Sequence, residues 1–363
     1  MIVWGAAGVV VLAFVLSALA APLARQIALR YRVLDIPSSH KSHASPTPLL
    51  GGSAIFFAVA MPAVGALAVA SFWAATGVPQ FLSQWATHIS GAALRAPLAL
   101  GILAGAAAIH ILGVLDDRRG LAAWFKLAMQ TLVVMILVSA CRLNFPAGLH
   151  GTTGFIVTVV WLVVVINAFN FLDNMDGLCA GVACLLAAAM LGVTAGTGQM
   201  FVSAWLCLLI GAVAGFLPAN FPPARQFMGD GGSLLIGYML GVLTCLTDFA
   251  GPAAMAGPNG IFVPLVLMAV PLYDLFSVII LRLAEGRNPM IGDLRHFSHR
   301  LVRRGMSVRR SLLTNYLCAA ATATSATLLT YTIGPAGVVL VLVQLAALLL
   351  IMTMLEAGGG KTR

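Results

Sequence analysis

Charge is scarce in this chain: only 9% of its 363 residues are Asp, Glu, Lys or Arg, while 61% are hydrophobic. A water-soluble domain carries charge on about a quarter of its residues. The mean hydropathy of +1.01 therefore excludes a soluble globular protein and indicates one that uses the lipid bilayer as its solvent.

Several other features are missing. The six cysteines are scattered and have no metal-ligand spacing, and no internal repeat, low-complexity tail or second soluble domain is visible. The first apolar run lacks the basic leading region and small-residue cleavage site of a secretory signal, so we expect a permanent membrane helix there. These absences predict one transmembrane domain over residues 1–363.

Apolar runs recur along the whole chain. A helix needs about 20 residues to cross about 30 Å of hydrocarbon, and a lipid-exposed backbone must satisfy its own hydrogen bonds. The sequence therefore predicts an all-α, polytopic membrane protein with about eleven transmembrane helices. We expect them near residues 2–22, 50–72, 97–115, 121–140, 154–171, 178–197, 201–217, 232–250, 259–283, 312–332 and 334–355.

The basic residues fall on one side of this arrangement. When the loops are assigned to alternate sides, all of the 20 Lys and Arg residues except Arg95 and Arg142 share one side. By the positive-inside rule that side is cytoplasmic, so the N-terminus lies outside and the C-terminus lies in the cytoplasm. The net charge of +9 is then an orientation signal, and we expect no nucleic acid partner.

Acidic residues gather on the same side, although the positive-inside rule does not use them. Of the 11 Asp and Glu residues, only Asp248 falls outside. Carboxylates from distant parts of a chain converge on one face only if something neutralises their repulsion. The sequence therefore predicts a divalent cation site at the cytoplasmic face.

Two acidic motifs carry this prediction. Asp116 and Asp117 end the third expected span, where an adjacent pair suits metal binding or general-base work, with ordinary helix-end solvation as an equal alternative. In the stretch NAFNFLDNMDG, residues 167–177, Asn167, Asn170, Asp173 and Asp176 follow one another at intervals of three. Its oxygens suit magnesium and its amides suit a nucleotide or sugar, whereas helix capping explains one or two of the four polar residues.

The other motifs are glycine-rich or basic. Asp230 begins the eighth expected span, where it can approach a phosphate-bound metal or act only as an N-cap. Phe227 can stack on a base or anchor at the membrane interface. Basic residues around Lys41 and His299 suit binding of phosphate or another anion. The alternative without a binding function is that they form a positive-inside loop or contact lipid headgroups.

The ordered motifs DD, N-x-x-N-x-x-D-x-x-D-G, N-x-x-P-x-x-x-F-M-G-D-x-G-S, P-x-x-D and H-x-x-H-R-L resemble those of the polyprenyl-phosphate N-acetylhexosamine-1-phosphate transferase superfamily, within glycosyltransferase family 4. The resemblance covers about residues 35–305. It implies transfer of an N-acetylhexosamine-1-phosphate, above all GlcNAc-1-phosphate, from a UDP-sugar to undecaprenyl phosphate with release of UMP. The implied cofactor is Mg²⁺, or Mn²⁺ in its place, and the implied location is the cytoplasmic face of the inner (plasma) membrane, at the first membrane step of cell-envelope polysaccharide synthesis.

The resemblance also assigns roles to residues by motif position. Asp230 resembles the magnesium ligand, with Asp117 beside it. Phe227 resembles the aromatic residue that stacks on uracil. The implied catalytic residues are Asp116, Asp117, Asp173 and Asp176, and the implied substrate-binding residues are Asn167, Asn170, Asn220, Phe227, Lys41, His43, His296, His299 and Arg300.

Alternatives remain within and outside this family. Ser298 stands where the hexosamine branch usually has a second histidine, which leaves the donor sugar open. The phospho-N-acetylmuramoyl-pentapeptide transferase branch carries a triple histidine followed by Phe-Glu, which is absent here. A cation-coupled secondary transporter is the rival class, but such sites lie near the bilayer midplane and often in inverted repeats. A homodimer through membrane helices is a further expectation that no motif tests.

Overall fold

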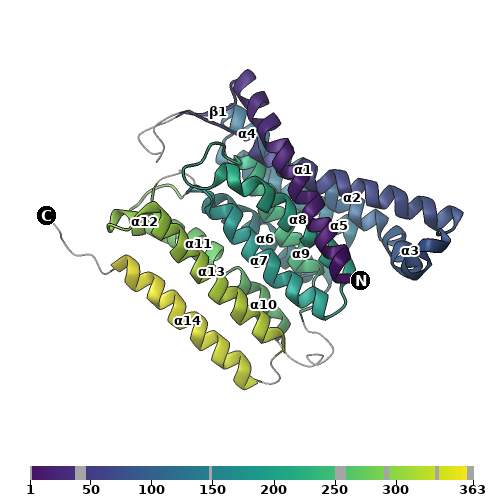
Figure 1. Ribbon diagram of the computed structural model, residues 1–363. Helices are drawn as coiled ribbons and strands as arrows, with labels where there is room; N and C mark the ends of the chain where they lie inside the picture. The colour runs from purple at the N-terminus through teal and green to yellow at the C-terminus, as the bar shows by residue number, and fades with distance from the viewer. Residues whose placement is uncertain are drawn as a thin grey trace.

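The structure, a computed structural model, describes residues 2–36, 46–146, 149–249, 259–289, 294–331 and 335–357, and this part of the chain is almost entirely helical (Figure 1). The helices are α1 (Ile2–Arg30), α2 (Gly51–Thr76), η1 (Gln80–Trp85), α3 (Ala86–Leu94), α4 (Ala96–Arg119), α5 (Ala123–Cys141), α6 (Gly151–Leu172), α7 (Leu178–Gly196), α8 (Met200–Asn220), α9 (Asp230–Leu246), α10 (Asn259–Leu267), α11 (Ala269–Ala284), α12 (Phe297–Arg303), α13 (Val308–Tyr331) and α14 (Pro335–Ala357). Two short strands, β1 (Leu34–Asp35) and β2 (Thr47–Pro48), pair antiparallel with Leu34 opposite Pro48. The all-α prediction is confirmed.

Nine of the helices in the described ranges are long and apolar enough to cross a membrane, and each coincides with an expected span. The other two expected spans differ. The span 232–250 is the shorter helix α9, of 17 residues. The span 259–283 is interrupted at Met268, between α10 and α11. Pro271 has no N–H to donate to the carbonyl of Leu267, so the helical hydrogen-bond ladder is broken at this point.

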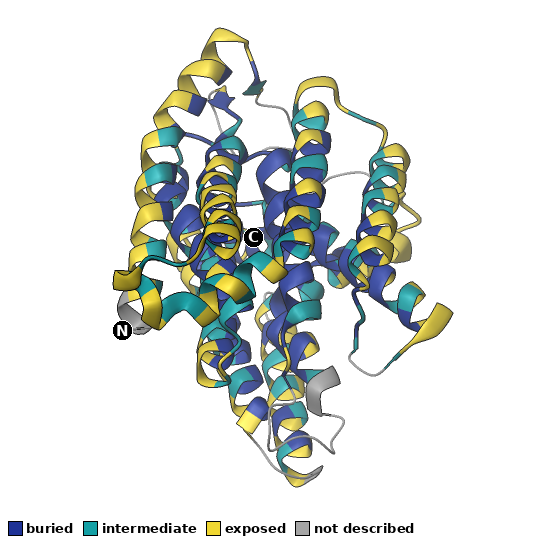
Figure 2. Ribbon diagram, turned by 90° about the vertical axis from the view of Figure 1, so that its right-hand side faces the viewer, coloured by how far each residue is buried: buried dark blue, intermediate teal, exposed yellow. Residues whose placement is uncertain are grey.

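Helix α9 lies at the centre of the bundle. Every residue from Gly231 to Thr244 is buried, and the helix packs against α2, α4 and α6. Figure 2 shows the same pattern, with buried residues along the inner helices and exposed residues on the outward faces. The first residue of α9, Asp230, is therefore held among the ends of several surrounding helices.

Helix α14 lies at one edge of the molecule, alongside α13 (Figure 1). Only 17% of its most apolar stretch is buried within the protein, whereas 67% of the corresponding stretch of α8 is buried. Its C-terminal end also contacts the short helix α12. Few contacts therefore hold α14 in place, so each polar bond that it makes contributes a larger share to its attachment.

Candidate active site

Asp230 is positioned by the glycine before it and by Asp117. Gly229 has φ 67° and ψ 179°, and a Cβ atom at this position would collide with the Asp117 carboxylate, so only glycine fits. The two Asp117 oxygens accept hydrogen bonds from the backbone nitrogens of Asp230, at 2.8 Å, and Gly231, at 3.1 Å. Asp117 of α4 thus satisfies two free N–H groups of α9 and lies at the positive end of its dipole.

Lys126, in the first turn of α5, brings two carboxylates together. Its Nζ atom lies 2.7 Å from Oδ2 of Asp116 and 2.5 Å from Oδ2 of Asp230. The other oxygen of Asp230 accepts a hydrogen bond of 2.8 Å from the Asn170 amide of α6. We call Asp116, Asp117, Lys126, Asn170 and Asp230 the carboxylate cluster. The sequence places these residues on four helices, and the fold gathers their ends at one point.

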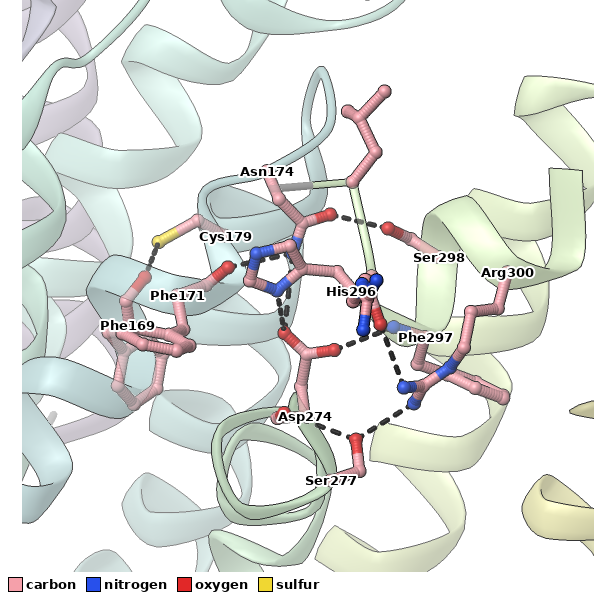
Figure 3. Close-up of polar contacts among 12 residues, drawn as sticks. Phe169, Phe171, Asn174, Cys179, Asp274, Ser277, His296, Phe297, Ser298 and Arg300 are labelled. Carbon is pink, nitrogen blue, oxygen red and sulfur yellow. Dashed lines mark hydrogen bonds and ion pairs between the residues drawn. The ribbon is translucent and has the colours of Figure 1, made fainter. Parts of the chain in front are cut away.

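A second group surrounds the start of α12 (Figure 3). Asp274 of α11 accepts hydrogen bonds from Nδ1 of His296 and from the backbone nitrogen of Phe297, both at 2.7 Å. The Asn174 amide donates to the same carboxylate at 3.3 Å, and its oxygen accepts a bond from the Ser298 hydroxyl. We call Asn174, Asp274, His296, Ser298 and His299 the histidine cluster. Asp274 fixes the first turn of α12 and the direction of the His296 ring.

His299 is buried beside His296, with ring centroids 6.3 Å apart. Burial lowers the pKa of His299 to about 4, and the neighbouring His296 ring also acts in this direction. His299 is therefore a neutral imidazole at physiological pH, able to accept one hydrogen bond and donate another.

The end of α6 and the turn after it join the two clusters. Asn170 bonds to Asp230, and Asn174, only four residues later, bonds to Asp274. Asp173 lies between them, and burial raises its pKa well above the ordinary value, helped by the charges of Asp230 and Asp117. The two clusters are therefore neighbouring parts of one site rather than two separate sites.

The carboxylate cluster has the donors for a divalent cation, although within the described ranges no three His, Cys, Asp or Glu side chains form a ready metal site. Asp116 and Asp230 each place one oxygen against the same ammonium group, so a single cation in that place would contact both carboxylates. Hard carboxylate oxygens are the ligands that Mg²⁺ prefers. Both Asp117 oxygens are occupied by backbone N–H groups, so its geometry favours holding α9.

Three residues predicted for the site bond elsewhere in the protein. Asn167 donates to the side chain of a buried glutamine in α5. Asp176 accepts a 2.8 Å bond from the backbone of Ala224, and Asn220 accepts a 3.1 Å bond from the backbone of Gly177. The last two bonds hold the segment after α8 against the turn after α6. The predicted catalytic role of Asp176 and the predicted substrate contacts of Asn167 and Asn220 stay predictions.

The remaining predicted residues lie around this centre or outside the described residues. Phe227 is half-buried and packs against the small apolar cluster that contains Val33 and Leu49. Arg300 bonds to the Ser277 hydroxyl of α11 and to Glu356 of α14. Lys41 and His43 fall outside the residues that the structure describes.

The sequence reasoning missed Lys126, Asn174 and Asp274 as site residues. Lys126 had a usable signal, because it is one of three lysines in the chain and begins an apolar span only ten residues after Asp116. Asp274 stood in the P-x-x-D motif without a role. Asn174 had no signal, because nothing in the sequence shows that it faces α11.

Comparison with known proteins finds a matching family and several relatives of this chain. A family model described as glycosyl transferase family 4 matches residues 99–248, which include Asp116 and Asp230. Over 324 residues the chain is 32% identical to a decaprenyl-phosphate N-acetylglucosaminephosphotransferase of Mycolicibacterium smegmatis, covering 81% of this chain and 74% of the relative.

Two further relatives have similar names. A probable undecaprenyl-phosphate N-acetylglucosaminyl 1-phosphate transferase of Bacillus subtilis is 29% identical over 85% of this chain and 81% of its own length. An undecaprenyl-phosphate alpha-N-acetylglucosaminyl 1-phosphate transferase of Escherichia coli K12 is 26% identical over 89% of this chain and 84% of its own length.

Proposed function

Because this chain belongs to glycosyl transferase family 4 and to its prenyl-phosphate sugar-1-phosphate transferases, we propose that it transfers N-acetylglucosamine-1-phosphate from UDP-GlcNAc to undecaprenyl phosphate and releases UMP. The names of the relatives support this choice of sugar and of prenyl acceptor.

The observation that carries the proposal is the convergence of Asp116 and Asp230 on one cationic group. Both substrates are anions, so their reaction needs positive charge between them. Asp230 and Asp116 would hold Mg²⁺, with Asp117 beside them. Bound there, the ion offsets the charge of the donor diphosphate.

The chain's own residues would prepare the reacting groups. In direct transfer, an oxygen of the lipid phosphate attacks the β-phosphorus of the donor, and the bond from that phosphorus to the UMP oxygen breaks. Asp116 or Asp117 would act as the base that keeps the lipid phosphate dianionic. A two-step route through an aspartyl-phosphate is the alternative. Asp173 stands between the clusters, and we assign it and Asp176 to the catalytic side of the site.

The histidine cluster would receive the donor's diphosphate and sugar. His296 has its ring direction fixed by Asp274, and neutral His299 supplies one donor and one acceptor. We assign Phe227 to stacking on uracil, and Asn170 and Asn220 to nucleotide or sugar contacts.

We also propose that the site lies on the cytoplasmic face of the inner (plasma) membrane. The strongest support is the distribution of charge, because all but two of the 20 basic residues fall on the same side of the expected spans as the site. UDP-sugars are soluble in water and the prenyl acceptor is soluble in lipid, so a site at helix ends gives access to both.

The test uses the purified protein in detergent with undecaprenyl phosphate and Mg²⁺. UDP-GlcNAc, UDP-GalNAc and UDP-MurNAc-pentapeptide are supplied in parallel, and UMP release is measured for the wild type, Asp230→Asn and Asp248→Asn. The proposal predicts release with UDP-GlcNAc that is lost in Asp230→Asn and kept in Asp248→Asn, because Asp248 is exposed at the other end of α9. UMP release with only one of the other donors would mean that the transferred sugar is not GlcNAc. If folded protein released no UMP with any of the three donors, the proposal would be rejected.

A further inference from the structure

The edge helix α14 is bonded to the histidine segment through one acidic side chain, Glu356. Oε1 of Glu356 accepts a hydrogen bond of 2.7 Å from Nη2 of Arg300 in α12 and one of 3.0 Å from the Tyr273 hydroxyl in α11. The side chains of Arg300 and Glu356 are only 12% and 14% exposed, respectively. One carboxylate thus connects three helices from the C-terminal third of the chain.

Arg300 continues this connection toward the site (Figure 3). Its Nη2 atom also donates to the Ser277 hydroxyl at 2.8 Å, and its Nη1 atom donates to the carbonyl of Arg295 at 2.7 Å. Ser277 in turn donates to the carbonyl of Asp274, the residue that holds His296. Asp274 fixes the start of α12, and the guanidinium of Arg300 fixes its middle.

The pair is mostly shielded from solvent, and this makes Glu356 the sensitive member. Removing one partner of a buried ion pair leaves the other charge without compensation, which costs more than losing an exposed pair. Among the residues that the structure describes, the buried Nε atom of Arg300 already has no hydrogen-bond acceptor, so no spare acceptor lies beside the guanidinium to replace Glu356. Without Glu356, its guanidinium would turn toward water or another acceptor and release its bonds to Ser277 and to residue 295.

We propose that Glu356 is a positioning residue, which holds α12 through Arg300 so that His296 and His299 face the donor. The inference rests on the proposed function for its effect on turnover, but not for its effect on the α12 segment. It gives α14 a role in the site even though none of its residues belongs to either cluster.

The test compares Glu356→Gln, Glu356→Asp and Thr353→Ala with the wild type in the full-length protein. Thr353 is the matched control, because it lies one turn earlier on α14 and also contacts the Tyr273 hydroxyl, at 3.2 Å, but carries no charge. Three quantities are measured: amide hydrogen exchange of residues 294–303, the melting temperature in detergent, and kcat and KM for UDP-GlcNAc.

We expect faster exchange in residues 294–303 of Glu356→Gln, with exchange in α6 and α9 unchanged, and about a tenfold rise in KM with a smaller change in kcat. Glu356→Asp should lie between Glu356→Gln and the wild type, and Thr353→Ala should match the wild type. Unchanged exchange and KM in Glu356→Gln would overturn the proposal, as would faster exchange throughout the protein with KM unchanged. If Glu356→Gln does not fold, the same comparison for Glu356→Asp decides. A wild type that shows no transfer would reject the proposed function, while the exchange data would still test the positioning role.

Discussion

Nζ of Lys126 lies 2.5 Å from Oδ2 of Asp230, although the two residues are 104 positions apart in the sequence. The same nitrogen contacts Asp116, so one ammonium group compensates two carboxylates where the ends of α4, α5 and α9 meet. Nearby, Asn170 and Asn174 join this arrangement to the histidine cluster.

Replacing Lys126 with Met should reduce UMP release by about 100-fold or more, because the site loses a cationic group placed where the substrates bring negative charge. Arg119→Ala is the control, since Arg119 is a solvent-exposed cation at the end of α4. The measurement is initial rate at saturating donor and acceptor. A Lys126→Met rate within threefold of the wild type would show that the lysine has only a structural role.

Asp117→Asn should lower both stability and turnover. An asparagine keeps only one acceptor oxygen, so one of the two N–H groups of α9 would face an amide nitrogen. Loss of such a cap costs about 1 kcal/mol of unfolding free energy, and the resulting shift of Asp230 should slow the reaction. Thermal unfolding and initial rates are measured in one detergent, with exposed Asp248→Asn as the control. Wild-type melting and turnover in Asp117→Asn would contradict the proposed bracing of α9.

Two glycines of α2 give a matched pair for testing how closely the helices must pack. A Cβ atom at Gly52 would collide with the backbone of Gly232 in α9, whereas a Cβ atom at Gly65 would meet no atom of the described residues within 4 Å. Gly52→Ala should therefore destabilise the protein by about 1–3 kcal/mol through overpacking and disturb Asp230. Gly65→Ala should behave as wild type. Equal melting temperatures and rates for the two variants would show that α2 does not constrain the site.

The lowered pKa of His299 predicts a loss of stability in acid. Its pKa is about 4 in the folded protein, against an ordinary value of 6.5, so the unfolded chain takes up the proton first as the pH falls. The contribution of His299 to stability is therefore present above about pH 6.5 and is lost as the pH falls toward 4. Thermal unfolding at pH 7.5 and 4.5 should show a larger drop in melting temperature for the wild type than for His299→Gln. The same drop in both proteins would mean that His299 titrates normally.

Hydrophobicity alone predicted most of the helices. The expected spans follow the observed helices because an apolar run of sufficient length has few other conformations in a bilayer. The break at Met268 was missed because the apolar pattern continues through it. Pro271 marks the place, but proline also occurs inside α2 and α8 without dividing them.

The sequence predicted many of the residues that lie at the site, but not how their side chains contact one another. Asp116, Asp117 and Asp230 fall on the same side of the expected spans, which allowed the prediction that they converge, and the structure brings them together. The sequence did not predict which of these side chains also hold neighbouring backbone in place. Asp176 and Asn220, for example, also accept backbone hydrogen bonds that hold the segment after α8, and the sequence gives no sign of these contacts.

The most direct measurement follows the β-phosphate of the donor. The wild-type protein is supplied with UDP-GlcNAc labelled at the β-phosphorus, undecaprenyl phosphate and Mg²⁺, and the lipid and water-soluble products are separated. Transfer of a sugar-1-phosphate predicts that the label appears in the lipid product while UMP is released in equal amount. Label that remains in water-soluble UDP, with only the sugar moved to the lipid, would contradict the proposed reaction.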